Sequence, residues 1–145
     1  DITMGDLYEI MPFDNYLVTM ELPGSELKKA IDHGINNPSI TDGQFSGLRV
    51  TYDPEAEQGS SIVSITLEDG SPVEDDEYYT VVINDFMLTG GDKYDFSRGR
   101  NVVNTYIPVR DALVDAVMNQ KTLTPVGPDY ISPVSANDVE LESAA

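Results

Sequence analysis

The chain has 145 residues, no cysteine and a formal net charge of −18, from 26 acidic and 8 basic side chains. This length is typical of one domain and is sufficient for a hydrophobic core without a disulfide or a structural metal. The excess of negative charge argues against nucleic acids and anionic membrane surfaces as main partners, because lysine and arginine bind both. No apolar run approaches the roughly 20 residues of a membrane span, and we expect no signal peptide within this sequence. The chain begins at Asp1, and we expect it to be part of a longer protein.

The first third of the chain predicts a helix, a strand and a second helix. Thr3 is a suitable N-cap for a helix that ends before Pro12. Residues 16–22 show a two-residue alternation, which indicates a strand with one well-buried face. A helix follows over about residues 25–33, and Gly34 is suited to the position just after its end.

Further strands are predicted at 48–52, 61–67 and 78–84, the last of them buried. Polar residues at 35–45 indicate a loop, and the acidic run at 74–77 indicates a solvated one. The clearest helix comes late, with apolar residues at helical spacing: Val109, Ala112, Leu113, Ala116 and Val117.

After Lys121 the composition changes to threonine, proline, serine and small residues, so we predict a tail or linker over 122–145. The remaining elements predict one α+β domain over residues 1–121, with a mixed β-sheet and flanking helices.

The strongest indication of a binding site lies where the strand at 78–84 ends. Phe86 follows the strand, and Gly90, Gly91 and Asp92 form a turn. An aromatic ring offers a flat face, glycines let the backbone approach a ligand, and a carboxylate accepts hydrogen bonds from hydroxyl groups. The pattern therefore fits a site for a small molecule with a ring. It also fits a core phenylalanine followed by an ordinary turn.

Signs of catalysis are lacking. The one histidine, His33, lies at the end of a predicted helix, where a structural role is favoured, and it cannot form the usual metal site alone. No nucleophile elbow or phosphate-binding loop occurs, so we expect no catalytic or metal-binding residue in this chain. Three basic residues follow the glycine turn and either neutralise nearby acids or form a positive rim for an anion: Lys93, Arg98 and Arg100.

Several segments, in order, resemble the C-terminal domain of the 5′-nucleotidase family, which includes UDP-sugar hydrolases and cyclic-nucleotide phosphodiesterases. The similarity extends over about residues 2–121. Its segments are Ile2-Thr3-Met4-Gly5-Asp6-Leu7 with Met11-Pro12-Phe13, Leu22-Pro23-Gly24-Ser25-Glu26-Leu27-Lys28-Lys29-Ala30, Phe45-Ser46-Gly47-Leu48-Arg49-Val50-Thr51-Tyr52-Asp53, and Tyr79-Thr80-Val81-Val82 with Asn84-Asp85-Phe86 and Gly90-Gly91-Asp92-Lys93-Tyr94.

The resemblance implies a two-domain enzyme. An N-terminal metallophosphoesterase domain, outside this chain, is expected to hold two divalent metal ions and to activate a water. The C-terminal domain is expected to bind the nucleoside, with no cofactor of its own, and to rotate as a body.

By position, Phe86 resembles one of two aromatics that enclose the base, and Asp92 resembles the carboxylate that binds the ribose hydroxyls. Asp42 stands where we expect the second aromatic, so Phe45 is its candidate substitute. The family's Gly-rich segment that contacts base and phosphate is absent from this sequence, and Lys93 replaces a usual glycine.

These features together predict the nucleoside-binding domain of a secreted or surface nucleotide phosphohydrolase, inactive when separated from its catalytic domain. Its partners are expected to be a nucleotide or nucleoside and that N-terminal domain, and its location extracellular, at the cell surface or in the periplasm. The alternative is a non-catalytic adhesion or interaction module that kept the fold and lost the pocket.

Overall fold

The structure is a computed structural model that describes residues 1–124 and 130–134. These residues form two compact units. Unit 1 consists of residues 1–22 and 80–124, and unit 2 consists of residues 23–79 and 130–134. The boundary between the units falls inside the region predicted as one domain, at the end of one strand and within another.

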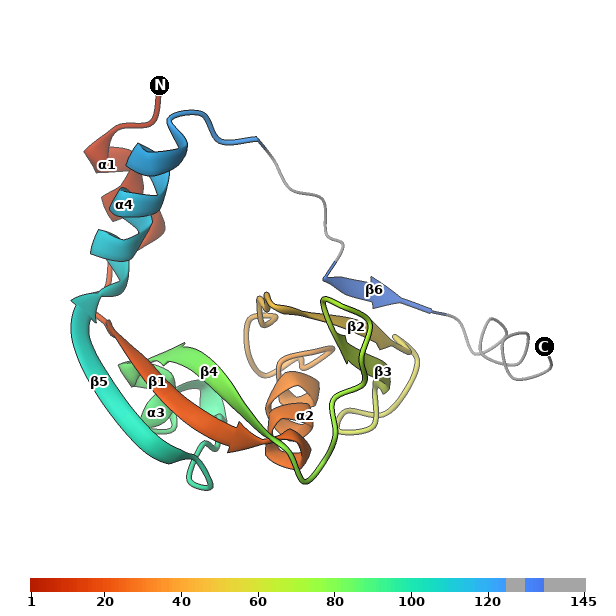
Figure 1. Ribbon diagram of the computed structural model, residues 1–145. Helices are drawn as coiled ribbons and strands as arrows, with labels where there is room; N and C mark the ends of the chain where they lie inside the picture. Colours follow the sequence, from red (N-terminus) through yellow and green to blue (C-terminus); the bar gives the residue numbers. More distant parts are fainter. Residues whose placement is uncertain (125–129, 135–145) are drawn as a thin grey trace. The chain divides into compact units, whose positions relative to one another are not determined.

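Unit 1 is built on a three-stranded sheet with the order β4-β1-β5 (Figure 1). Strand β1 pairs antiparallel with β5, from Tyr16 opposite Pro108 to Glu21 opposite Arg100. Helices α1 and α4 pack against each other. The elements are α1 (Met4–Ile10), β1 (Tyr16–Pro23), β4 (Tyr78–Asn84), α3 (Asp85–Leu88), the 3₁₀ turn η1 (Gly91–Lys93), β5 (Arg100–Pro108) and α4 (Val109–Gln120).

The predictions for the start of the chain are confirmed. Thr3 caps α1, because its hydroxyl accepts a hydrogen bond from the Asp6 N–H while the Asp6 carboxylate accepts one from the Thr3 N–H. Strand β1 alternates as its sequence indicates. The face that it buries contributes half of the unit 1 core, which consists of Leu7, Val18, Met20, Leu22, Tyr94 and Phe96.

One prediction for unit 1 needs correction, and one of its strands was not predicted. Strand β4 is not buried: it forms one edge of the sheet, and Val82 is 58% exposed. An uninterrupted apolar run is typical of a central strand, but it does not exclude an edge position. Strand β5 was not predicted at all. This strand is interrupted by two register shifts and by positive φ angles at Asn101 and Tyr106. Because such irregularities break the regular change of side between successive residues, the sequence does not show the two-residue alternation that marks a strand.

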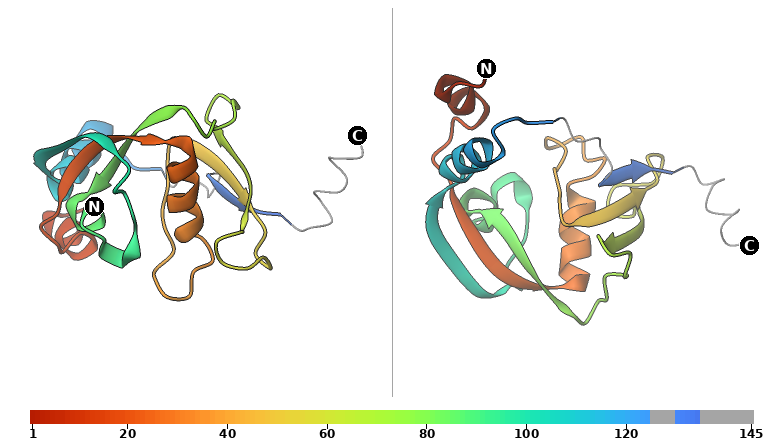
Figure 2. Two further views of the ribbon diagram at one scale, coloured as in Figure 1. Left: turned by 90° about the horizontal axis from the view of Figure 1, so that it is seen from below. Right: turned by 45° about the horizontal axis from the view of Figure 1, so that its top comes forward.

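Unit 2 combines helix α2 with a second three-stranded sheet, in the order β3-β2-β6 (Figure 2). Strand β2 pairs antiparallel with β3 and parallel with β6, so this sheet is mixed, as predicted. The elements are α2 (Gly24–His33), β2 (Leu48–Tyr52), β3 (Ile62–Leu67) and β6 (Ile131–Pro133). The core consists of Leu27, Ala30, Ile31, Ile35, Leu48, Val50, Ile65 and Val73.

The start of α2 explains the acidic run at 74–77. The N-cap residue is a proline and offers no side-chain hydrogen bond. The N–H groups of Gly24 and Ser25 instead donate to the backbone carbonyls of Glu77 and Asp75, at 2.8 and 3.1 Å. The side chains of the run are exposed, as expected, but its backbone caps a helix.

The segment predicted as a tail differs from the structure at residues 130–134. The Val50 N–H donates to the Tyr130 carbonyl at 2.7 Å, and the Val134 N–H donates to the Tyr52 carbonyl at 2.8 Å. This segment therefore completes the unit 2 sheet. Its composition suggested a linker because proline and serine dominate the surrounding sequence. The rest of the predicted tail, at 125–129 and 135–145, lies outside the described residues.

Candidate functional site

The phenylalanine after β4 is presented by a short helix rather than buried in the core. Asn84 caps α3, because its side-chain oxygen accepts a hydrogen bond from the Met87 N–H at 2.8 Å. Phe86 lies in this single turn of helix and is 49% exposed. The interpretation of Phe86 as a core residue is therefore wrong, and half of its surface is open to solvent.

The two glycines after α3 have separate physical roles. Gly90 has φ +92, a left-handed conformation that side chains rarely adopt. Gly91 lies directly against Phe86: a Cβ added there would be 2.4 Å from two ring carbons and 2.5 Å from the Phe86 carbonyl oxygen. Only glycine lets the backbone approach the aromatic ring this closely. Phe86 and Gly91 are therefore in direct contact, and Gly90 directly precedes Gly91 in the same turn; that these residues bind a ligand stays a prediction.

Asp92 completes this turn in an unusual backbone conformation. Asp92 and Lys93 both have positive φ, 52° and 61°, although neither is a glycine. Such conformations cost free energy and often occur at functional sites. The next residue, Tyr94, is buried and stacks on Phe96 with ring centroids 5.9 Å apart. Burial raises the pKa of the Tyr94 phenol, and the negative charge of Asp92 raises that pKa further.

Unit 1 has other exposed aromatic side chains, and one of them, Phe13, was not among the predicted site residues. Phe13 lies in the irregular segment between α1 and β1, and it is 73% exposed. This segment leads into Tyr16, whose N–H donates to the Asp85 carboxylate at 3.1 Å. Asp85 directly precedes Phe86, so a hydrogen bond joins the two aromatic-bearing segments. In the sequence, Phe13 follows Pro12 and belongs to no apolar pattern of a helix or strand, and this was the available sign that its ring is not part of the core.

Phe45 belongs to unit 2, in the long loop before β2, and it is partly buried. The same loop borders a cavity of about 730 Å³. Asp42 lines this cavity together with Gly43, Gln44 and Tyr52. Two amides of this region make structural hydrogen bonds: Asn36 donates to the Pro54 carbonyl, and Asn37 donates to the His33 carbonyl.

The described residues offer no further site of obvious chemistry. Within 1–124 and 130–134, no three histidine, cysteine, aspartate or glutamate side chains gather closely enough to hold a metal ion. No helix in this part of the chain has the length and apolar character needed to cross a membrane. Among the three basic residues after the glycine turn, Arg100 pairs with Glu21 of β1 at 3.5 Å.

Comparison with known proteins places the chain in a family. The sequence profile of the 5′-nucleotidase C-terminal domain matches residues 1–98. The chain belongs to this family. The 5′-nucleotidase C-terminal domain described here thus contains both the Phe86 turn and the Phe13 segment within the matched region.

Individual relatives support this assignment. A cell wall protein of Listeria monocytogenes is 30% identical over 123 residues, covering 83% of this chain and 16% of that protein. Human 5′-nucleotidase is 28% identical over 137 residues, covering 80% of this chain and 24% of that protein. The crystal structure of a 5′-nucleotidase precursor from Thermus thermophilus superposes with a TM-score of 0.84 at 31% identity, over 92% of this chain and 28% of that one. The chain thus spans about a quarter or less of these two curated relatives.

Proposed function

We propose that this domain binds the nucleoside part of a nucleotide for a metal-dependent phosphohydrolase of which it is one part. The observation that carries the proposal is the half-exposed Phe86 ring, packed on the Gly91 backbone and followed by the Asp92 carboxylate, in a 5′-nucleotidase C-terminal domain. The ring supplies a stacking face for a base, and base–aromatic stacking contributes roughly 1–3 kcal/mol. The carboxylate supplies acceptors for ribose hydroxyls.

A base enclosed on both faces needs a second aromatic. Phe13 is the better candidate, because it is largely exposed and belongs to the same unit as Phe86, to which its segment is hydrogen-bonded through Asp85. Phe45, expected from the sequence, is the other candidate. It lies in unit 2 and is less exposed.

The catalytic chemistry would come from another part of the whole protein. We propose that an N-terminal metallophosphoesterase domain holds two divalent metal ions, which activate the attacking water and stabilise the charge on phosphorus. The similarity to a Listeria cell wall protein and to 5′-nucleotidases supports a location outside the cytoplasm, at the surface or in the periplasm.

The decisive experiment is a titration of the 145-residue chain with adenosine and with AMP, followed by backbone amide NMR shifts. We expect the shifts to cluster at residues 11–16 and 84–94. Phe86→Ala should weaken binding roughly 5- to 150-fold, the equivalent of one lost stacking face, while the chain stays folded. Phe13→Ala and Phe45→Ala then distinguish the two candidates for the second face. Flat spectra at millimolar ligand would refute nucleoside binding by this chain and favour an interaction module.

A further inference from the structure

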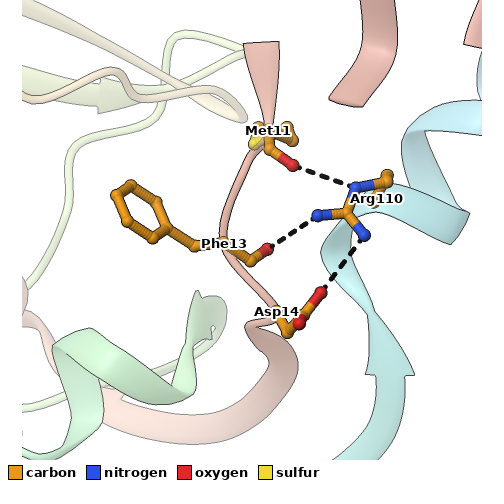
Figure 3. Close-up of polar contacts among 4 residues, drawn as sticks. All are labelled: Met11, Phe13, Asp14 and Arg110. Carbon is orange, nitrogen blue, oxygen red and sulfur yellow. Dashed lines mark hydrogen bonds and ion pairs between the residues drawn. The ribbon is translucent and has the colours of Figure 1, made fainter. Parts of the chain in front are cut away.

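One arginine side chain holds the segment that carries Phe13. Arg110, in the first turn of α4, makes three contacts with this segment (Figure 3). Its Nε donates to the Met11 carbonyl at 2.9 Å, one terminal nitrogen donates to the Phe13 carbonyl at 3.5 Å, and the other pairs with the Asp14 carboxylate at 3.2 Å. A planar guanidinium suits such a set of acceptors, because its donors are fixed in a fork.

The position of Arg110 is not explained by the stability of its helix. A positive charge at a helix N-terminus opposes the helix dipole. The side chain is nevertheless only 11% exposed, and its guanidinium lies 4.0 Å from the centroid of the Tyr8 ring on α1. A largely buried cation needs such compensation. The contacts that compensate it are made almost entirely with α1 and the Phe13 segment.

The segment is restrained elsewhere as well, while the Phe13 ring is left open. The Val109 N–H donates to the Asn15 carbonyl at 2.9 Å, and the Tyr16 N–H donates to Asp85 at 3.1 Å. Figure 3 shows the Phe13 ring directed away from Arg110, which contacts only the Phe13 backbone. A fixed backbone that presents an exposed aromatic ring to solvent is suited to ligand binding, because little conformational entropy of the backbone remains to be lost when the ligand binds.

We propose that Arg110 is a positioning residue of the nucleoside site: it fixes the 11–14 backbone so that Phe13 forms the second stacking face for the base. This inference rests on the proposed function. Arg110 touches no ligand itself and acts only through Phe13. Without the guanidinium, the segment occupies the binding-competent arrangement for a smaller fraction of the time, and the apparent dissociation constant rises in inverse proportion to that fraction.

The test measures the dissociation constant of the 145-residue chain for adenosine by NMR or calorimetry in four proteins. These are the unaltered chain, Arg110→Gln, Phe13→Ala and the double variant. Adenosine carries no phosphate, so the removed positive charge has no direct electrostatic effect on the ligand. Arg49→Gln is the matched control, because it removes the same charge from an exposed arginine in unit 2.

We expect Arg110→Gln to weaken binding by roughly three- to tenfold, through the loss of the competent fraction. Phe13→Ala should weaken it by roughly 5- to 150-fold. In the Phe13→Ala background, Arg110→Gln should have no further effect, because the ring through which it acts is gone. Arg49→Gln should leave the affinity unchanged. Equal effects of Arg110→Gln with and without Phe13, or no effect in either, would overturn the inference.

Two further results separate the possible failures. If the unaltered chain does not bind adenosine, the proposed function fails, and the inference fails with it. If the chain binds adenosine and only the coupling between Arg110 and Phe13 is absent, the inference alone fails. Should Arg110→Gln not fold, Arg110→Lys serves in its place. A lysine keeps the charge but cannot reach three acceptors as a fork, so an intermediate loss is expected, and unaltered affinity refutes the inference.

Discussion

Replacement of Gly91 by alanine is the sharpest test of how the Phe86 turn is built. The added Cβ would meet two Phe86 ring carbons at 2.4 Å and the Phe86 carbonyl oxygen at 2.5 Å. Ordinary contacts between carbon atoms are about 3.5–4.0 Å, so each neighbour must move by about 1 Å. The half-exposed ring can swing outward, but the carbonyl belongs to the backbone of α3 and cannot yield alone.

Forced rearrangements of this kind typically cost 1–3 kcal/mol. For a chain of this size, such a loss lowers the melting temperature by roughly 3 °C per kcal/mol, or about 3–9 °C. The displaced ring no longer lies on the Gly91 backbone, so nucleoside affinity should fall together with stability. The two effects have one cause, the clash with Phe86, and should therefore appear in the same variant.

The assay combines thermal unfolding, followed by circular dichroism, with the adenosine titration by NMR. Gly47→Ala is the matched control: Gly47 has φ +83, and an added Cβ would meet no atom within 4 Å. That variant should lose about 1 kcal/mol through backbone strain alone and keep its affinity. If Gly91→Ala retains both the melting temperature and the affinity of the unaltered chain, the packing of Phe86 on Gly91 is refuted.

Three other outcomes follow from the same turn. Asn84→Ala removes the cap that accepts the Met87 N–H, and it should lower the free energy of unfolding in urea by about 1 kcal/mol; an unchanged midpoint would contradict the capping role. The pKa of Tyr94 is raised in the folded chain above its ordinary value of 10.0. The contribution of the neutral phenol to the free energy of unfolding is therefore complete below pH 10.0, and it is lost as the pH rises through the folded pKa. Absorbance at 295 nm should therefore show a late titration step that Tyr94→Phe removes. Asp92→Asn should lower the Tyr94 pKa only in part, because burial is the larger cause of the raised pKa. A titration curve that Tyr94→Phe leaves unchanged at its alkaline end would refute this. In the proposed full-length phosphohydrolase, Asp92→Ala should raise KM more than it lowers kcat if the carboxylate binds ribose, and the reverse pattern would count against that role.

The elements that the sequence predicted well are those with a strong local signal. Helix α1 has a capping pair three residues apart, and β1 has a strict alternation in which every second side chain is buried. The Phe86 turn was found in the same way. Its glycines mark a conformation and a close approach that other residues do not tolerate, and the structure shows both.

The features that sequence reasoning missed depend on residues far apart in the chain. Strand β5 has no alternation of its own and exists because β1 supplies its hydrogen-bonding partner. The three-residue strand β6 is defined only by its pairing with β2. Short or interrupted strands gain their stability from neighbours, so local patterns carry little information about them.

The sequence by itself determined the family of the domain, its α+β class and the turn at residues 84–94 that we propose as part of the binding site. The tertiary structure decided that Phe86 and Phe13 are open to solvent, and that Arg110 holds the backbone of the Phe13 segment. Arg110 reaches the backbone of Phe13 from 97 residues away. No periodicity or motif encodes that contact, because it arises only when the first turn of α4 and the end of α1 are packed together.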